Sequence, residues 1–351
     1  MIIDKSKPVM ITGATGYVGG MITKKFLEDG LKVHAPIRNP ENKEKTKYLE
    51  AAAANSSGSI TFFKADLLNE GSYDKSMAGC ELVVHTASPF ISSTKNPQTD
   101  LVDPALKGTT NVMNSVRKMD SVKRVVLTSS CVAMYGDAKD TLNYPNQTMT
   151  EDLWNTTSSV SRSPYNYSKV VAEKKAWEMT DNQKRFDLVV INPSFVLGPG
   201  LSPHQTSESY NIIKQFGDGS MKMGSADLNM GCVDVRDVAE AHFKAAFTPS
   251  AKGRHITNAE NLSFLGLAQM LAPKFGADYP LPKKNLPKWL VWLTGPMAGI
   301  PRQFVKDNVG YPWKADNSKT KRELGIKFRP ISETINEFFQ FMIDNGTFKK
   351  K

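Results

Sequence analysis

The feature that most constrains the fold is an alternation, through the first half of the chain, of short apolar runs with segments of helix length. The runs consist mainly of Val, Ile, Leu and Phe, and segments such as 17–30, 41–54 and 105–119 lie between them. This alternation predicts βαβ units and an α/β fold, with a doubly wound parallel sheet buried on both faces. We expect strands at 8–13, 31–37, 59–65, 80–87, 122–130 and 186–192.

The pattern loosens after residue 193, where Pro and Gly become frequent. Within this part, the helical spacing of residues 234–247 predicts a helix. Residues 253–258 predict one short strand that rejoins the sheet. The chain therefore divides into a regular first part and a less regular second part.

We predict that residues 1–193 form a nucleotide-binding domain to which later segments such as 231–258 return. Residues 194–351 are expected to form mainly a smaller substrate-binding lobe. The apolar stretch 289–300 is too short to span a bilayer. We expect it to be a buried or pocket-lining helix followed by a turn.

The composition excludes several classes of protein. The formal net charge is +10 over 351 residues, but the lysines are scattered. We expect a solvated basic surface that helps to gather an anionic cofactor, with no nucleic-acid partner and no membrane partner. The cysteines show neither a disulfide framework nor metal-ligand spacing, which predicts a cytoplasmic protein without a metal site; they are Cys80, Cys131 and Cys232. No base neighbours Cys131 in the sequence, so we expect it to be a packing residue.

A glycine-rich turn follows the first apolar run. Residues 13–19 read Gly-Ala-Thr-Gly-Tyr-Val-Gly, a GxxGxxG pattern that opens a helix-length segment. Glycines let the backbone turn sharply and bring N–H groups close to a pyrophosphate at the positive end of the helix. In a βαβ unit this pattern predicts a Rossmann-type dinucleotide site formed by Gly13, Thr15, Gly16, Tyr17, Val18 and Gly19.

The residue after the second apolar run indicates which dinucleotide is favoured. Arg38 stands where an NAD-preferring protein typically places an acid for the adenosine ribose hydroxyls. Its planar guanidinium suits a 2′-phosphate, and Lys45 supplies a second charge near the start of the next helix. We therefore predict NADPH (or NADP) rather than NADH as the cofactor. The alternative is that both residues are ordinary surface charges.

Polar residues also follow the third and fourth runs. Asp66 and Leu67 are placed to contact the adenine edge, and residues 85–88 read His-Thr-Ala-Ser beside the expected pyrophosphate and nicotinamide ribose. His85 is a candidate contact to the cofactor backbone. Nothing in the sequence makes it a general base or a metal ligand.

A Tyr-x-x-x-Lys pair opens a helix-length segment beyond the fifth run. The i,i+4 spacing places Tyr165 and Lys169 on one helix face. A free phenol has a pKa of about 10, and a nearby ammonium favours the phenolate, which lowers the pKa of the phenol and helps it to transfer a proton. The fifth run ends in Thr128-Ser129-Ser130, at the sheet edge where a hydroxyl can hydrogen-bond a substrate carbonyl. Alternatively, the serine only caps a turn.

Six segments together resemble the extended short-chain dehydrogenase/reductases. They read GATGYVG, HTAS, LTSSC, YNYSKVVAEKKAW, INPSFVLGPG and VDVRDVAEAH, and they lie between residue 9 and about residue 245. More narrowly, they are similar to the group of dihydroflavonol-4-reductases, cinnamoyl-CoA reductases and microbial aldehyde/ketone reductases. The segment around Tyr165 lacks the longer aromatic-and-cysteine signature of cinnamoyl-CoA reductases, which argues against a CoA-thioester substrate.

The resemblance implies a catalytic triad of Ser130, Tyr165 and Lys169, with Ser130 preferred to Ser129 because the family's serine is the last of the strand-end run. Many extended members have an Asn at the start of the helix after the fourth strand, where this chain reads Pro-Ala-Leu-Lys-Gly. We therefore expect Asn111 to support the structure. In addition to the glycine-turn residues, Arg38, Lys45, Asp66 and Leu67, the resemblance implies cofactor contacts at Tyr165, Lys169, Thr86, Ala87, Ser88, Thr128, Pro193, Ser194 and Val196.

These observations predict NADPH-dependent reduction of an aldehyde or ketone to the alcohol, with Tyr165 as the general acid. We expect a small-molecule carbonyl substrate and a monomer or homodimer. One alternative is a sugar-nucleotide epimerase or dehydratase, disfavoured by Arg38. The other is a non-catalytic dinucleotide sensor, which has no need of the triad. The substrate pocket is expected to be walled by Phe90, Ile91, Met134, Tyr210 and residues 286–300.

Overall fold

The computed structural model describes residues 1–88, 94–181, 183–203, 205 and 207–348. Seven strands form the large sheet: β1 (Val9–Thr12), β2 (Lys32–Ile37), β3 (Ser59–Lys64), β4 (Leu82–His85), β5 (Arg124–Thr128), β6 (Asp187–Pro193) and β9 (Gly253–Thr257). All pair in parallel, in the order β3-β2-β1-β4-β5-β6-β9. Each overlaps a strand predicted from the sequence, so the predicted α/β fold with a doubly wound parallel sheet is confirmed.

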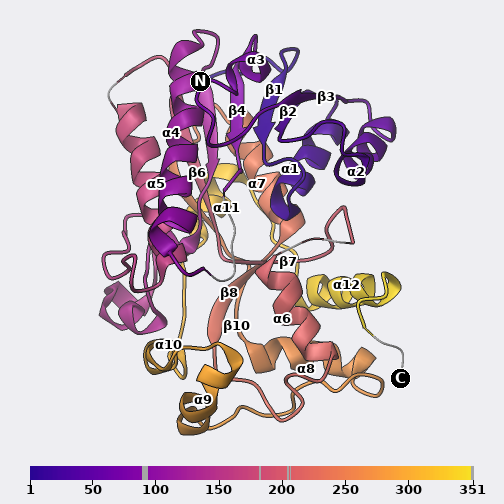
Figure 1. Ribbon diagram of the computed structural model, residues 1–351, viewed down its shortest axis with the longest axis vertical. Coiled ribbons are helices and arrows are strands. Elements are labelled where there is room, and N and C mark those ends of the chain that lie inside the picture. Colours follow the sequence, from indigo (N-terminus) through magenta and orange to yellow (C-terminus); the bar gives the residue numbers. More distant parts are fainter. Residues whose placement is uncertain (89–93, 182, 204, 206, 349–351) are drawn as a thin grey trace.

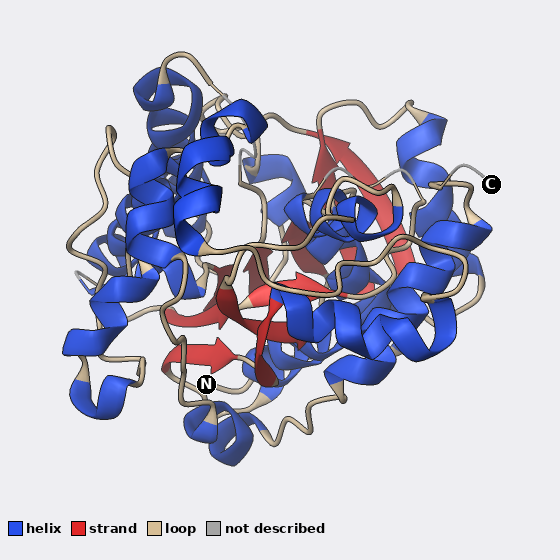
Figure 2. Cartoon of the chain, turned by 90° about the horizontal axis from the view of Figure 1, so that it is seen from below, coloured by secondary structure: helices blue, strands red, loops and turns tan. Residues whose placement is uncertain are grey.

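Helices cover both sides of this sheet (Figure 2). On one face α1 (Tyr17–Glu28) packs against α7 (Val235–Phe247), and on the other α4 (Asp103–Lys118) packs against α5 (Pro164–Asp181). Successive strand residues enter the two cores in turn: Val9 and Ile11 face α1, whereas Met10 faces α4. Strands covered on both faces need apolar side chains at every position, which explains the continuous apolar runs. The shorter α3 (Asp74–Met77) and the outer α2 (Lys43–Ala54) complete this part.

The strand order reverses at β1. This strand pairs with β2 on one side and with β4 on the other, so that Val9 stands opposite both Val33 and Leu82. In doubly wound sheets, a reversal of this kind opens a ligand-binding crevice at the carboxyl ends of the two strands. Gly13 and Thr86 directly follow β1 and β4 and therefore stand at that crevice.

A second sheet of three strands was not predicted. Its order is β10-β8-β7, from β7 (Phe195–Leu197), β8 (Asn229–Asp234) and β10 (Glu260–Ser263). Sequence patterning misses it because β7 has three residues and β8 includes Asn229, Gly231 and Asp234 among its six, so neither reads as an apolar run. The helices α6 (Glu208–Gly217), α8 (Phe264–Phe275) and α12 (Ile331–Asp344) pack on this sheet.

The segment at the lower end of Figure 1 comprises α9 (Lys288–Thr294), a 3₁₀ turn (Gly295–Ala298) and α10 (Arg302–Asn308). The expectation that residues 289–300 are buried is wrong, because most of their large apolar side chains are exposed. Val291 is the buried residue of α9 and packs against Val305 and Val309, since a short helix that packs on one side buries a single row of side chains. After this segment, α11 (Ser318–Leu324) returns to contact β9.

Two residues expected at the pocket wall lie in the core instead. Tyr210 is buried, its ring meets Phe338 edge to face, and its hydroxyl accepts a hydrogen bond from the Gly200 amide at 3.0 Å. Met134 is fully buried in a cluster with Trp313. The other two wall candidates, Phe90 and Ile91, lie outside the described residues. No described helix combines the length and the apolar character that crossing a bilayer requires.

Candidate active site

The glycine turn brings β1, α1 and β4 into close contact. Gly13 has a φ of +70°, and a Cβ there would lie 2.6 Å from the Thr86 Oγ1. A Cβ on Gly19 would lie 2.1 Å from the Gly13 carbonyl oxygen. The turn closes through a hydrogen bond from the Gly16 amide to that oxygen at 2.9 Å. Both Gly13 and Gly19 must therefore lack a side chain for the turn to form.

The first turn of α1 keeps its amide groups available. No side chain caps this helix at Gly16, and no acidic residue stands in its first turn. The positive end of the helix dipole thus faces the crevice uncompensated, which suits an anion. Tyr17 points into the core, where its hydroxyl donates to the Gly198 carbonyl at 2.6 Å. Any contact of Tyr17 with a nucleotide would therefore use its backbone.

The two predicted adenosine-end cations are exposed. Arg38 follows the last residue of β2, and Lys45 lies in α2. Neither forms an ion pair with a carboxylate of the described residues. Both charges therefore remain available to an anionic group.

The loop after β3 is held by Asn111 of α4. The Asn111 side chain accepts a hydrogen bond from the Gly71 amide at 3.1 Å and donates to the carbonyls of Leu67 and Asn69. Asp66 caps the same loop, accepting from the Leu68 amide at 2.9 Å. These bonds use the whole Asn111 amide, in keeping with the supporting role expected for it. They also fix the loop that carries Asp66 and Leu67.

Thr12, which the sequence analysis did not single out, organises the end of β4. Its hydroxyl accepts hydrogen bonds from the amides of Thr86 and Ala87, each at 3.1 Å, while its carbonyl accepts from the Thr86 hydroxyl at 2.7 Å. The His85 Nδ1 lies 2.8 Å from the same Thr12 hydroxyl. Burial, with a smaller effect from the Lys169 charge, lowers the pKa of His85 to about 3. His85 is therefore neutral and structural at physiological pH.

Tyr165 and Lys169 lie together on the first turns of α5. This helix begins at Pro164, whose fixed φ suits a first helical position. The Lys169 Nζ lies 5.7 Å from the centre of the Tyr165 ring. Burial lowers the pKa of Lys169 to about 8, opposed by the nearby Glu173 carboxylate. The ammonium thus still carries its charge at neutral pH.

The pKa of Tyr165 differs from the sequence expectation. Burial, helped by the negative charge of Glu208, raises it to about 12 instead of lowering it. Desolvation of the phenolate is the larger cause, and the Glu208 charge acts in the same direction. The phenol keeps its proton, which is the state that a proton donor requires.

The strand-end serines have separate environments. Ser129 is buried and donates its hydroxyl hydrogen to Glu173. The Ser130 hydroxyl is partly exposed and makes long contacts, at 3.3 Å from the Val132 amide and 3.5 Å from the Pro193 carbonyl. Ser130 is thus the serine whose hydroxyl remains available to a ligand. This geometry supports choosing it over Ser129.

The remaining candidates line the same strand ends. Ser194 is fixed between β6 and β7 by donating its amide hydrogen to the Thr257 carbonyl at 3.0 Å, with Pro193 before it and Val196 after it. The Thr128 hydroxyl lies 2.7 Å from the His242 Nε2, so it is already engaged within the protein. A cavity of about 20 Å³, large enough for one water, lies between these strand ends and α5, lined in part by Ser88, Thr128, Lys169 and Glu173.

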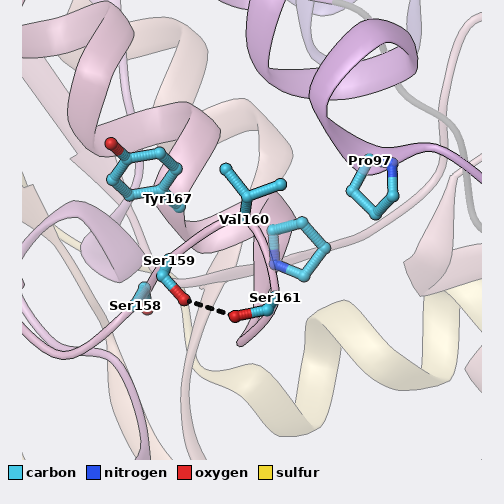
Figure 3. Close-up of a pocket in the computed structure, with 7 residues that line it drawn as sticks. Pro97, Ser158, Ser159, Val160, Ser161 and Tyr167 are labelled. Carbon is cyan, nitrogen blue, oxygen red and sulfur yellow. Dashed lines mark hydrogen bonds between the residues drawn. The ribbon is translucent and has the colours of Figure 1, made fainter.

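A wider hollow opens beside the start of α5 (Figure 3). It has a volume of about 710 Å³ and is lined by Pro97, residues 158–161, Pro164 and Tyr167. Tyr167 follows Tyr165 by two positions, which turns its side chain to a different side of the helix. The hollow contains none of the predicted triad, so the strand-end crevice remains the candidate reaction centre.

Comparison with known proteins agrees with this geometry. The model of the NAD dependent epimerase/dehydratase family matches residues 9–259. The chain belongs to this family. Its relatives include cinnamoyl-CoA reductase CAD2 from Medicago truncatula, 32% identical over 331 residues that cover 94% of this chain and 93% of that protein. Tetraketide alpha-pyrone reductase 1 from Arabidopsis thaliana is 32% identical over 350 residues, 98% of each chain.

Among solved structures, the yeast methylglyoxal/isovaleraldehyde reductase Gre2 complexed with NADPH is similar over 96% of this chain and 98% of its own. The TM-score is 0.75 at 29% identity. The resemblance to extended short-chain dehydrogenase/reductases is therefore confirmed.

This member of the epimerase/dehydratase family also has a buried hub that sequence analysis missed. Glu173 of α5 is buried and accepts hydrogen bonds from Ser129, from Asn192 at 3.0 Å and from the Trp177 indole at 3.2 Å. The Arg254 Nε of β9 lies 2.7 Å from its Oε1. The Arg254 guanidinium in turn lies 4.1 Å from the centre of the Trp154 ring, which belongs to a loop.

The position of Glu173 in the sequence carried a signal. It follows Lys169 by four residues and Tyr165 by eight, which places all three on one face of α5. A carboxylate on a helix face that otherwise enters the core requires buried partners. Trp177 lies on α5 itself, but Ser129 directly follows β5, and Asn192 and Arg254 lie on β6 and β9, so only the tertiary structure identifies these partners.

Proposed function

We propose that this protein reduces an aldehyde or ketone to the alcohol with NADPH as the hydride donor. The observation that carries the proposal is the neutral phenol of Tyr165 beside the charged Lys169, on the same edge as the available Ser130 hydroxyl. The most similar relatives described above bear the names of reductases. A small-molecule carbonyl is the substrate class that this donor arrangement suits.

The residues present fit a phosphorylated dinucleotide. The uncapped start of α1 suits the pyrophosphate, and the unpaired, exposed Arg38 and Lys45 suit a 2′-phosphate. Lys169 forms no ion pair with a carboxylate of the described chain, which leaves its donors for ribose hydroxyls. When bound, NADPH supplies the hydride that the carbonyl carbon accepts. The residues proposed to hold it are Gly13, Thr15, Gly16, Tyr17, Val18, Gly19, Arg38, Lys45, Asp66, Leu67, Thr86, Ala87, Ser88, Thr128, Tyr165, Lys169, Pro193, Ser194 and Val196.

Side chains of the protein then bind the carbonyl oxygen of the substrate and donate a proton to it. Ser130 donates a hydrogen bond to the carbonyl oxygen and stabilises the negative charge that develops on it. Tyr165 transfers its phenolic proton to that oxygen. The Lys169 ammonium stabilises the phenolate that remains. The water-sized cavity beside Lys169 offers a route by which a proton returns.

Nucleotide binding and substrate selection are assigned to different parts of the chain. We assign nucleotide binding to residues 1–193 with the returning segments within 231–258, and substrate selection mainly to 194–351. The three cysteines are free and buried, which suits a reducing, cytoplasmic setting. The protein would act as a monomer or homodimer.

One observation favours a second candidate. The matched family takes its name from epimerases and dehydratases, which use a tightly held dinucleotide and return it unchanged. Arg38 weighs against this alternative because NAD has no 2′-phosphate for it to bind. A purified protein that retained NAD and consumed no added NADPH would support it.

The proposal is tested by following NADPH absorbance with purified protein. Four substrate classes are supplied: 2-oxoaldehydes, aromatic or unsaturated aldehydes, β-ketoesters and flavonoid-like ketones. We expect at least one class to be reduced, and Tyr165→Phe to lose turnover by about 10²–10⁴-fold while still binding NADPH. Oxidation of NADPH by Tyr165→Phe at the rate of the unaltered protein would overturn the mechanism.

A further inference from the structure

The exposed side chains of α9, the turn after it and α10 form an apolar surface, here named the α9–α10 face. Single exposed apolar side chains are normal in folded proteins, but contiguous patches of them mark interaction sites. The other large exposed apolar side chains of the described chain lie outside this segment, at Met1, Ile2, Leu68, Leu142 and Met223. The face comprises Trp289 (67% exposed), Trp292 (43%), Leu293 (54%), Met297 (90%) and Phe304 (38%).

The exposed charges of this segment and of the residues just before it all have one sign. Residues 279–306 include five basic residues and no acidic residue: Lys283, Lys284, Lys288, Arg302 and Lys306. All five are exposed, and none forms an ion pair with a carboxylate of the described residues. The Arg302 guanidinium lies 4.5 Å over the Trp292 ring, so cationic and apolar groups share one surface. The next acid, Asp307, is buried and paired with Arg162.

The presence of exposed apolar side chains and exposed cations on one surface distinguishes between a second copy of the chain and a lipid surface as the partner. In a symmetric dimer formed through the face and the adjoining Lys283 and Lys284, cations would meet like cations without a carboxylate of residues 279–306 between them, although the Lys288 ammonium is already bonded to the Lys306 and Val309 carbonyls. An anionic lipid surface satisfies both properties, because its headgroups attract the cations and its acyl boundary accepts the apolar side chains. Trp in particular is favoured at the boundary between lipid and water. We propose that the α9–α10 face binds the surface of an anionic membrane without crossing it.

The face is a fixed platform rather than a loose arm. The Asn308 side chain donates to the Asp137 Oδ1 at 2.7 Å, and the Arg162 guanidinium bridges Asp137 and Asp307 at 2.6 and 3.1 Å. Arg162 stands three residues before Tyr165. The platform is therefore anchored close to the start of α5. In Figure 1 it lies at the end of the molecule away from the N-terminus.

The scattered lysines and the shortness of residues 289–300 led to the expectation of no membrane partner, and these residues were expected to be buried or to line a pocket. The exposure of Trp289, Trp292, Leu293 and Met297 contradicts the expectation of burial. The proposal is independent of the reductase assignment, since a surface can bind lipid whatever reaction the crevice performs. Its test therefore measures binding directly.

The experiment uses the full chain with two kinds of vesicle, one of phosphatidylcholine alone and one of phosphatidylcholine and phosphatidylserine at roughly 2:1. We expect the protein to sediment with the phosphatidylserine vesicles, and its tryptophan emission to shift to shorter wavelength there. Binding should weaken as salt is raised, because the cations contribute to it. Failure to sediment with the phosphatidylserine vesicles at low salt would overturn the proposal.

Two variants locate the binding surface. Trp289→Ser with Leu293→Ser should reduce the affinity for phosphatidylserine vesicles by about tenfold or more, and Lys283→Gln with Lys284→Gln should reduce both the affinity and its salt dependence. Matched controls far from the face are Ile2→Ser, a residue 79% exposed, and the exposed Lys32→Gln. Neither control should change vesicle binding.

The same variants are assayed in solution for reductase activity and for mass by light scattering. Unchanged activity and mass, together with lost vesicle binding, would support the proposal. A dimer that the Trp289→Ser, Leu293→Ser variant abolishes would instead assign the face to a second copy of the chain. A raised KM for the carbonyl without any loss of vesicle binding would assign it to the substrate pocket, and either result would overturn the proposal.

Discussion

The two ends of the proposed dinucleotide site place positive charge in opposite surroundings. At the adenosine end, Arg38 and Lys45 are exposed and unpaired within the described chain. At the nicotinamide end, Lys169 lies in partly buried surroundings, where desolvation lowers its pKa to about 8, and the neutral Tyr165 lies beside it. One end offers mobile charges in water, and the other offers a fixed charge in a medium of lower dielectric.

This difference separates recognition from chemistry. Exposed charges are screened by salt and contribute modestly to binding, so the role we propose for Arg38 and Lys45 is to discriminate between phosphorylated and unphosphorylated cofactors. A charge held in partly dry surroundings acts strongly on its neighbours and needs no reorganisation during the reaction. Substitutions at the two ends should therefore change different kinetic constants.

The largest effect is expected at the buried end. Lys169→Met removes the charge that stabilises the Tyr165 phenolate, and kcat for carbonyl reduction should fall by about 10²–10⁴-fold. Single-turnover measurements with saturating NADPH would check this. Methionine matches the length of the aliphatic stem, so the thermal midpoint serves as a control for folding. An unchanged kcat in Lys169→Met would contradict the proposed difference in function between the nicotinamide end and the adenosine end of the site.

The neighbouring serines sharpen the comparison within the buried end. Ser130→Ala should lower kcat by about 10²–10³-fold because it deletes a donor to the developing oxyanion. Ser129→Ala leaves the Glu173 carboxylate with one donor fewer and should cost about 1–3 kcal/mol of stability with little change in kcat. Urea unfolding and steady-state kinetics separate the two outcomes. A reversal of the two effects would assign the catalytic hydroxyl to Ser129.

A smaller effect is expected at the exposed end. Arg38→Ala should raise KM for NADPH by about tenfold while kcat stays nearly constant, since it removes a screened contact to the 2′-phosphate. KM for NADH should hardly change, which provides the internal control. The salt dependence of KM for NADPH should also become weaker. Equal losses with both cofactors would contradict the role given to Arg38.

The smallest effect concerns pH. Lys169 carries its charge below a pKa of about 8, so kcat should be maximal below that pH and decline as the pH rises through it. The Glu173 carboxylate raises the pKa of Lys169. Glu173→Gln should therefore move the alkaline limb to lower pH. A pH profile of single-turnover rates would measure the shift.

A role for Glu173 confined to packing would lower stability without moving that limb. The matched control is Asn192→Ala, which removes one partner of Glu173 and keeps its charge. We expect this control to leave the alkaline limb in place. Movement of the limb in the control alone would contradict the assignment to the Glu173 charge.

Much of the first domain followed from local pattern. The apolar runs predicted six of the seven strands of the large sheet, because strands buried on both faces have few alternatives to Val, Ile, Leu and Phe, and residues 253–258 were predicted separately as the seventh. Gly13 and Gly19 were recognisable because each needs space that a Cβ would occupy. The Tyr165–Lys169 pair was recognisable because a helix brings positions four apart together.

The second part of the chain was less accessible to the same reasoning. The strands β7, β8 and β10 form through pairing among segments far apart in sequence. No continuous run of apolar residues predicts them. Residues 289–300 read as interior because they are apolar, yet Trp289 and Met297 face solvent. Hydrophobic character alone does not say what covers a side chain, since that depends on the neighbouring elements.

The sequence by itself therefore determined the large sheet and the glycine turn, because each depends on spacing along one strand or helix, and it supplied the candidates for the reacting side chains. Only the tertiary structure showed that burial raises the pKa of Tyr165, that the Ser129 hydroxyl is bonded to Glu173, and that Glu173 has further partners on α5, β6 and β9. These properties arise from burial and from partners distant in the chain. Desolvation and long-range hydrogen bonds exist only once the fold has formed.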